Sequence, residues 1–356
     1  MAEADNYEDT VKGKKEVDFA QFEDTKSGLL GRIQHALHVN PALVPLIILV
    51  FAIALFGLLL GQRFFSAGTL TLILQQVQIV GVLAAAQTLI ILTAGIDLSV
   101  GAIAVLSSVI MGQMTFRYGV PAEISILIGF AFGAGIGAVS GFLVSRIKIP
   151  PFIVTLGIWQ VVLAANYLFA NNQTIRSSDL RAEAPALLFL GNRVEIGGAN
   201  FTFGVILMIL IFIALGYALR STAWGRHVYA VGDDPEAAQL AGVNVKRTLM
   251  SVYMLTGLIC AVAGWVMIGR FSSVSPSAST GVIGNIQSIT AVVIGGLSLF
   301  GGRGSIYGAL FGAMIVGVFE LGLRMAGADP QWTFMLIGML IIGAVGLDQW
   351  IRKVSA

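Results

Sequence analysis

Charged residues are scarce in this sequence of 356 residues. Asp, Glu, Lys and Arg together make up 11% of it, against about 25% in an average soluble domain. Eight of the 19 acidic residues lie in the first 24 positions, so the rest of the chain carries few. Hydrophobic residues reach 56% and the mean hydropathy is +0.87. This composition excludes an ordinary soluble enzyme and predicts a protein of the lipid bilayer.

Several kinds of site are also excluded by what is missing. The single cysteine, Cys260, cannot form an internal disulfide or a metal site built from cysteines. A net charge of +2 without a basic run argues against nucleic acid as a partner. The chain has no Gly-x-x-x-x-Gly-Lys-Ser/Thr phosphate loop, because Gly13-Lys14 lacks the first glycine and the hydroxyl. We therefore expect no metal, no cofactor and no catalytic site, ATPase sites included.

Apolar stretches near the length of a membrane span dominate the sequence after a polar N-terminal segment. A spanning helix needs about 20 apolar residues. Such stretches run at about 42–60, 70–92, 99–115, 124–144, 152–171, 201–219, 249–269, 286–300, 305–323 and 332–350. The pattern predicts an all-α polytopic membrane protein of about ten transmembrane helices. Its domains are a polar cytoplasmic tail at 1–40 and a transmembrane domain at 41–356.

Lysine and arginine positions predict the orientation. With ten spans and a cytoplasmic N-terminus, 14 of the 21 basic residues fall on the cytoplasmic side and seven outside. This bias is the one expected of membrane proteins. Both termini are therefore predicted to be cytoplasmic. The longest external loop lies at about 172–200 and the longest internal loop at about 220–248.

The internal loop contains a short predicted helix. Its signals are an N-cap, a proline at the first helical position, an acid in the first turn, a small apolar face and a C-terminal glycine. The residues are Asp234, Pro235, Glu236, Ala237, Leu240, Ala241 and Gly242. The apolar face has no lipid to cover it on this side. It either packs back on the protein's own loops or docks into a groove of a cytoplasmic partner.

Three segments of this sequence resemble the permeases of bacterial ATP-binding-cassette importers for monosaccharides. They are Leu92-Thr-Ala-Gly-Ile-Asp-Leu-Ser-Val-Gly101, the internal loop from Gly225 to Arg247, and the glycine-rich stretch from Ala291 to Ser305. Within that family of ribose, xylose and fructose permeases, the sequence is most similar to the fructose permeases of rhizobia. The resemblance extends over nearly the whole chain from about residue 42.

The resemblance implies a permease subunit of the bacterial inner membrane that translocates a monosaccharide such as fructose or ribose. It implies a second permease copy, a cytoplasmic ATPase that binds the ATP and docks on the short helix, and a periplasmic sugar-binding protein. Alternatives are a permease of the same superfamily for another small solute and a passive polyol channel. The scarcity of ionisable residues inside the spans favours an ATP-driven importer over a secondary transporter.

Polar residues inside the spans are candidates for the sugar pathway, since sugar hydroxyls need amide and hydroxyl partners. They are Gln75, Gln76, Gln78, Asn166, Asn285 and Gln287. Each could instead form hydrogen bonds between helices. Asp97 precedes an apolar stretch, which favours a helix cap over an anchor beside the pathway. The glycines at 133, 135, 137 and 141 predict a close helix contact.

Overall fold

The structure is a computed structural model that describes residues 42–355, so the predicted tail at 1–40 lies outside the described residues. In the described part, ten apolar helices follow the ten predicted spans. Seven are long and apolar enough to cross a membrane, and the other three contain shorter apolar stretches, at Val100–Phe116, Ser279–Ile294 and Gln331–Leu340. The helices are α3 (Leu43–Leu60), α4 (Ala67–Leu92), α5 (Val100–Phe116), α6 (Ala122–Phe142), α7 (Pro151–Ala170), α9 (Phe203–Ser221), α12 (Val245–Phe271), α13 (Ala278–Ile294), α14 (Ile306–Met325) and α15 (Pro330–Ser355).

The remaining elements connect these helices. Two single turns, η1 (Gly61–Arg63) and η2 (Leu143–Ile147), follow α3 and α6. The loop after α7 holds α8 (Ser177–Glu183), η3 (Pro185–Gly191) and an antiparallel hairpin in which β1 (Arg193–Ile196) pairs with β2 (Ala199–Thr202). The loop after α9 holds α10 (Ala223–Asp233) and α11 (Pro235–Leu240).

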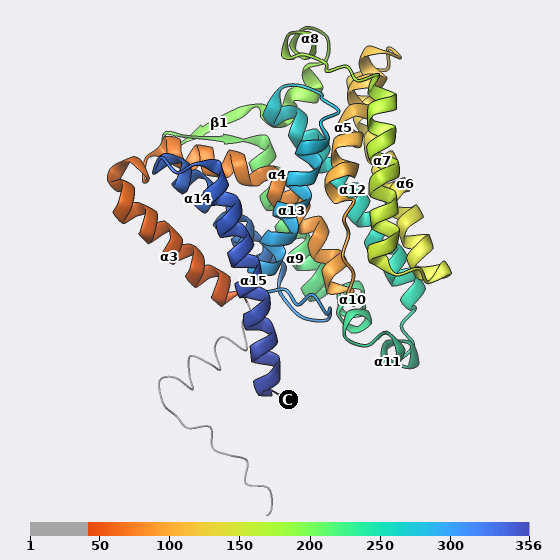
Figure 1. Cartoon of the computed structure of the whole chain (residues 1–356). Helices are drawn as coiled ribbons and strands as arrows, with labels where there is room; N and C mark the ends of the chain where they lie inside the picture. Colours follow the sequence, from red (N-terminus) through yellow and green to blue (C-terminus); the bar gives the residue numbers. More distant parts are fainter. Residues whose placement is uncertain (1–41, 356) are drawn as a thin grey trace, which may run out of the picture. The chain divides into compact units, whose positions relative to one another are not determined.

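The two long loops lie at opposite ends of the helices (Figure 1). The loop with α8 and the hairpin is at one end, and α10 and α11 are at the other, together with the last turn of α15. Four apolar helices, α12 to α15, lie between α11 and the C-terminal end of the described chain. This even number agrees with the predicted topology, and the charge bias assigns the α11 end to the cytoplasm.

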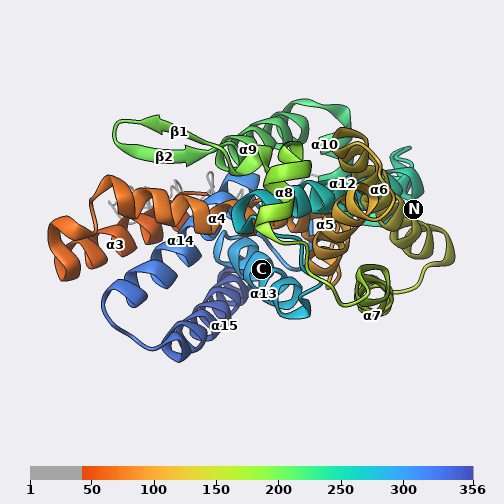
Figure 2. The ribbon, with the colours of Figure 1, turned by 90° about the horizontal axis from the view of Figure 1, so that it is seen from above.

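Helices α4 and α12 form the centre of the core. Of their most apolar windows, 72% is buried, against 22% for α7 at the edge. Seen from above in Figure 2, α4 and α12 lie among the other helices, whereas α3 and α7 lie at the periphery. Glycines allow α6 to approach α12 closely: a Cβ on Gly137 would lie 2.2 Å from the Tyr253 carbonyl oxygen. The predicted glycine contact is confirmed, except that Gly135 faces open space.

The eighth span differs from the prediction. Helix α13 begins at Ala278, eight residues before the predicted start at 286, and ends at Ile294 instead of 300. Its first half is rich in Ser, Thr, Gly and Asn, so hydropathy alone does not mark it as a span. Its end is set by Gly295 and Gly296, of which Gly296 has a φ of +77°. Asn285 and Gln287 therefore lie in the middle of a helix and not at its entrance.

Candidate functional site

The predicted short helix α11 is present and is capped as the sequence indicates. The Asp234 carboxylate accepts hydrogen bonds from the main-chain N–H groups of Glu236 (2.8 Å) and Ala237 (3.0 Å). Pro235 is the first helical residue, and Gly242 follows the helix with a φ of +85°. The helix ends at Leu240, one residue before the predicted Ala241.

The apolar face of α11 points away from the protein. The Leu240 side chain is 91% exposed, and Ala237 and Ala241 are exposed beside it. Only Ala238, on the opposite face, packs inward, with 5% exposure. A leucine presented in this way outside the membrane leaves an apolar surface that a partner can cover. The geometry therefore favours docking over packing on the chain's own loops.

Helix α10 lies in the segment predicted to be loop, and it leads directly into α11. The Thr222 hydroxyl caps it by accepting from the Gly225 N–H (3.2 Å), and Val228 and Val231 are buried beneath it. The Tyr229 hydroxyl donates to the carbonyl oxygen of Gly304 (2.9 Å). Burial raises the pKa of this hydroxyl, which keeps it neutral and able to donate. The threonine cap and the spacing of the two valines are signals that could have revealed this helix.

The three sequence segments that carry the resemblance meet at one place next to α11. The Gly302 N–H donates to the carbonyl oxygen of Leu92 (3.0 Å), at the end of α4. A Cβ on Gly232 would lie 1.8 Å from that same oxygen, and one on Gly301 would lie 2.5 Å from the Gly232 oxygen. We call these four residues, Leu92, Gly232, Gly301 and Gly302, the glycine junction. It joins the end of α10 to the α4–α5 and α13–α14 connections through main-chain atoms alone.

Asp97 lies in the α4–α5 connection and is 2% exposed. Its Oδ1 accepts from the Ser99 N–H (2.7 Å) and from the Ser99 hydroxyl (2.6 Å). Burial raises the pKa of this carboxyl and the Ser99 hydrogen bonds lower it. Ser99 is itself the N-cap residue of α5, so Asp97 stabilises the turn before the helix and not the free N–H groups of its first turn. The Gln87 amide, oriented to satisfy both groups, pairs with the main-chain N–H (3.2 Å) and C=O (3.1 Å) of Asp97.

Four of the six predicted pathway residues lie in contacts between elements. Gln78 accepts from the Thr202 hydroxyl (2.7 Å), and the Gln75 main-chain oxygen accepts from Arg270 Nε (3.2 Å). Asn166 donates to the Pro276 oxygen (2.9 Å) and Asn285 to the Leu98 oxygen (2.8 Å). All four side chains are at most 8% exposed. The side-chain contacts of Gln78, Asn166 and Asn285 are of the kind that joins neighbouring elements, whereas the Gln75 contact is made by its main chain.

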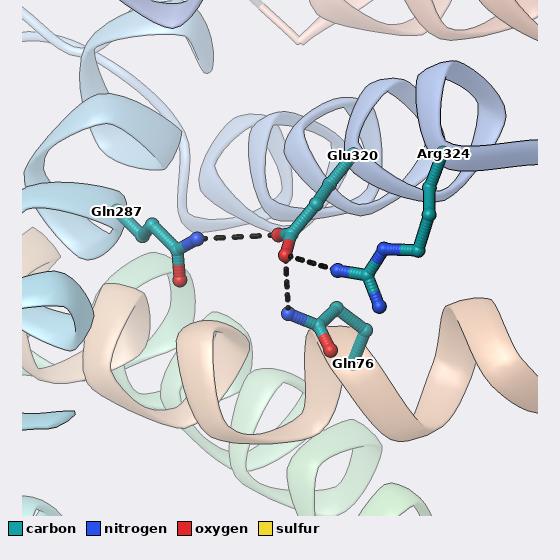
Figure 3. A network of polar contacts seen from close by, with 4 residues as sticks. All are labelled: Gln76, Gln287, Glu320 and Arg324. Carbon is teal, nitrogen blue, oxygen red and sulfur yellow. Dashed lines mark hydrogen bonds and ion pairs between the residues drawn. The ribbon is translucent and has the colours of Figure 1, made fainter. Parts of the chain in front are cut away.

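The other two predicted residues converge on a carboxylate that the sequence reading did not select. Gln76 Nε2 donates to Glu320 Oε1 (3.0 Å) and Gln287 Nε2 to Glu320 Oε2 (3.2 Å), as Figure 3 shows. Arg324 forms an ion pair with Glu320 Oε1 (3.1 Å) one turn along α14. The side chains come from α4, α13 and α14. We call Gln76, Gln287, Glu320 and Arg324 the Glu320 cluster.

Glu320 is not among the predicted pathway residues because the predicted span ends at 323, which places it near a membrane surface. Helix α14 runs to Met325, so Glu320 lies more than one turn inside it. The signal that could have found it is the i, i+4 spacing of Glu320 and Arg324, since opposite charges at this spacing meet on one helix face.

A small pocket lies between α5, α7 and α13. Trp159 and Leu163 of α7 line it beside Asn166, and Ser277 and Gly281 close its other side. The Asn166 Oδ1 atom is buried and has no hydrogen-bond partner in the described part of the chain.

Comparison with known proteins gives consistent results along the chain. Residues 69–345 match the family described as "Branched-chain amino acid transport system / permease component". The fructose import permease protein FrcC of Rhizobium meliloti is 63% identical over 97% of this chain and 96% of its own length. The ribose import permease protein RbsC of Escherichia coli is 33% identical over 86% of this chain and 92% of its own. The autoinducer 2 import system permease protein LsrC of Photorhabdus luminescens is 32% identical over the same shares.

Proposed function

Because the chain belongs to this family of import permeases, and to its sugar-permease branch, we propose that it is the membrane subunit of an ATP-binding-cassette importer that carries fructose into the cytoplasm. It is a multi-pass protein of the bacterial inner membrane. The single observation that carries the proposal is the 63% identity with a fructose import permease along 97% of the chain. The relatives named for ribose are 30–34% identical, which favours fructose among the monosaccharides.

The cytoplasmic partner in this proposal is a separate ATPase that binds ATP and docks on α11. Supporting it are the exposed Leu240 on the predicted cytoplasmic side and the lack of a phosphate loop in the chain. An apolar side chain of this size can fill a groove on a partner and contribute much of the binding free energy.

Helix α11 has a direct route to the membrane helices. Only Asp233 lies between Asp234, the cap of α11, and Gly232 in the glycine junction. Backbones that close cannot move independently, because even a methyl group finds no room between them. A displacement of α11 by the ATPase would therefore shift the end of α4 and the α13–α14 connection together, and such a shift could open or close a path between helices.

Two further partners complete the proposal. A periplasmic binding protein would deliver the sugar at the end that bears α8 and the β1–β2 hairpin (Figure 1). A second copy of this chain would enclose the sugar path. Support for the second copy comes from the polar residues of the Glu320 cluster, which are only partly covered by this chain and would be enclosed by a partner.

Reconstitution in lipid vesicles tests the function. The purified permease alone should hydrolyse no ATP, whereas adding the cognate ATPase and fructose-loaded binding protein should give fructose-stimulated hydrolysis and uptake. Robust hydrolysis by the permease alone would contradict the proposal. Uptake that needs neither ATP nor the ATPase would identify a passive channel instead.

A further inference from the structure

The Glu320 cluster places an acidic side chain where lipid would not favour it. Among the described side chains, Glu320 is the acid that lies inside an apolar helix more than one turn from its end. Met325, the last residue of α14, is five positions further along the helix, a distance of about 7.5 Å at 1.5 Å per residue. The start of α4 lies beside this end of α14, since the Thr69 hydroxyl contacts the Met325 sulfur at 3.9 Å. The cluster therefore lies in the outer half of the membrane, on the α8 side.

The cluster is not sealed inside the protein. The Glu320 side chain is 16% exposed and that of Arg324 is 67% exposed. Gln76 and Gln287 are also partly exposed. Exposing a carboxylate to lipid hydrocarbon costs free energy, because it loses the hydrogen bonds of its hydration water. Charged side chains at this depth therefore usually face a polar space inside the protein. The uncovered side of the cluster must therefore face a polar space, which in the proposed pair is the path that the second copy encloses.

The free hydrogen-bonding groups of the cluster suit one class of ligand. Each glutamine donates one N–H to Glu320 and turns its amide oxygen away from the carboxylate (Figure 3). The carboxylate can accept about four hydrogen bonds and receives three here. Acceptors and donors thus converge from three helices on one point. Neighbouring hydroxyls, each both donor and acceptor, match this set, whereas an anion would meet the Glu320 charge.

We propose that the Glu320 cluster is a sugar-contact site in the outer half of the transport path, in which Glu320 and the two amides bind hydroxyls of the passing monosaccharide. This inference rests on the proposed function. The opposing possibility is that the cluster only joins α4, α13 and α14. The two possibilities predict different uptake rates. Loss of a contact between helices lowers the uptake of every sugar equally, whereas loss of a sugar contact lowers it only for sugars that carry the bound hydroxyl.

The experiment compares wild type and Glu320→Gln in vesicles with the same ATPase and binding protein. Initial uptake is measured for fructose and for the singly deoxygenated fructoses. For each sugar, the uptake rate of the variant is divided by that of wild type. The sugar preference of the binding protein cancels in this ratio, because both permeases are supplied by the same binding protein. A hydrogen bond to a charged group contributes about tenfold or more, so Glu320→Gln should lower fructose uptake by at least about tenfold. For the analogue that lacks the contacted hydroxyl, the ratio should approach one, as in a double-mutant cycle.

Controls separate the outcomes. Glu123→Gln removes an exposed carboxylate from the first turn of α6 and should leave all ratios at one. Gln287→Met removes one amide at similar volume and should show the same dependence on one hydroxyl if Glu320→Gln does not accumulate. Unchanged fructose uptake, or an equal loss for every analogue, would overturn the sugar contact. Failure of wild type to import fructose would instead overturn the proposed function.

Discussion

The glycine junction and the Glu320 cluster connect helices by opposite means. The junction brings main-chain atoms of three connections together and contains no charged side chain. The cluster joins three helices through long polar side chains around one carboxylate. Main-chain contacts without room for a methyl group transmit displacement stiffly, whereas side-chain hydrogen bonds can exchange partners. In our proposals, the cytoplasmic end transmits displacement and the outer half contacts the sugar.

The largest effect is expected from Gly232→Ala at the glycine junction. The new Cβ would lie 1.8 Å from the Leu92 oxygen, a main-chain atom that cannot move without displacing α4. Overpacking of this kind typically costs about 1–3 kcal/mol and shifts the backbone. Fructose uptake in vesicles should fall by about tenfold or more, with every analogue affected equally. Gly135→Ala, which meets nothing within 4 Å, is the matched control and should transport normally.

Replacing Leu240 by aspartate should separate docking from folding. If Leu240 fills a groove on the ATPase, the variant places an unpaired carboxylate in the interface at a cost of about 2 kcal/mol or more. Co-purification of the ATPase should be lost, while membrane abundance of the permease stays normal because the side chain is 91% exposed. Gln239→Asp makes the same charge change at an exposed neighbour on α11. If Leu240→Asp bound the ATPase as well as the wild type does, α11 would be a surface helix without a docking role.

A smaller effect is expected at the end of α11. Gly242 has a φ of +85°, which a β-branched residue adopts at a cost of about 1–2 kcal/mol. Gly242→Val should therefore weaken ATPase binding by about tenfold by distorting the helix end. Gly242→Asn should remain near wild type, because asparagine tolerates this conformation. Equal ATPase affinities of the two variants would show that the cap geometry does not matter for docking.

The smallest effect tests the attachment of α10. Tyr229→Phe removes the hydrogen bond to the Gly304 oxygen, worth about 1 kcal/mol. We expect less fructose taken up per ATP hydrolysed, with the ATPase still bound and sugar discrimination unchanged. Tyr118→Phe, at an exposed position before α6, serves as the control. If Tyr229→Phe changed the discrimination among deoxygenated fructoses, the cytoplasmic end would also affect sugar contact, and the distinction between the glycine junction and the Glu320 cluster would be wrong.

Patterns over a few neighbouring residues predicted most of the helices. Ten spans follow from hydropathy, and the caps of α11 follow from Asp234, Pro235 and Gly242, because each signal acts within a few residues. The same reliance on local pattern displaced α13, whose polar first half hides its start. Gln76 and Gln287 were selected as polar residues inside spans, yet their convergence on Glu320 joins positions more than 200 residues apart in the chain. Likewise, nothing near Gly232 in sequence indicates that Leu92 and Gly302 pack against it.

The closeness of α11 to the junction also determines how far its motion is magnified. A helix of six residues is about 9 Å long, and only Asp233 lies between its cap, Asp234, and Gly232. Because α11 is short and close to the glycine junction, its rotation produces only a small displacement. A tilt of α11 by ten degrees displaces its far end by only about 1.5 Å, and the helices beyond the junction receive a movement of similar size. A rigid α11 would therefore not amplify the movement, and the proposed ATPase would have to supply nearly the whole displacement that the proposed sugar path requires.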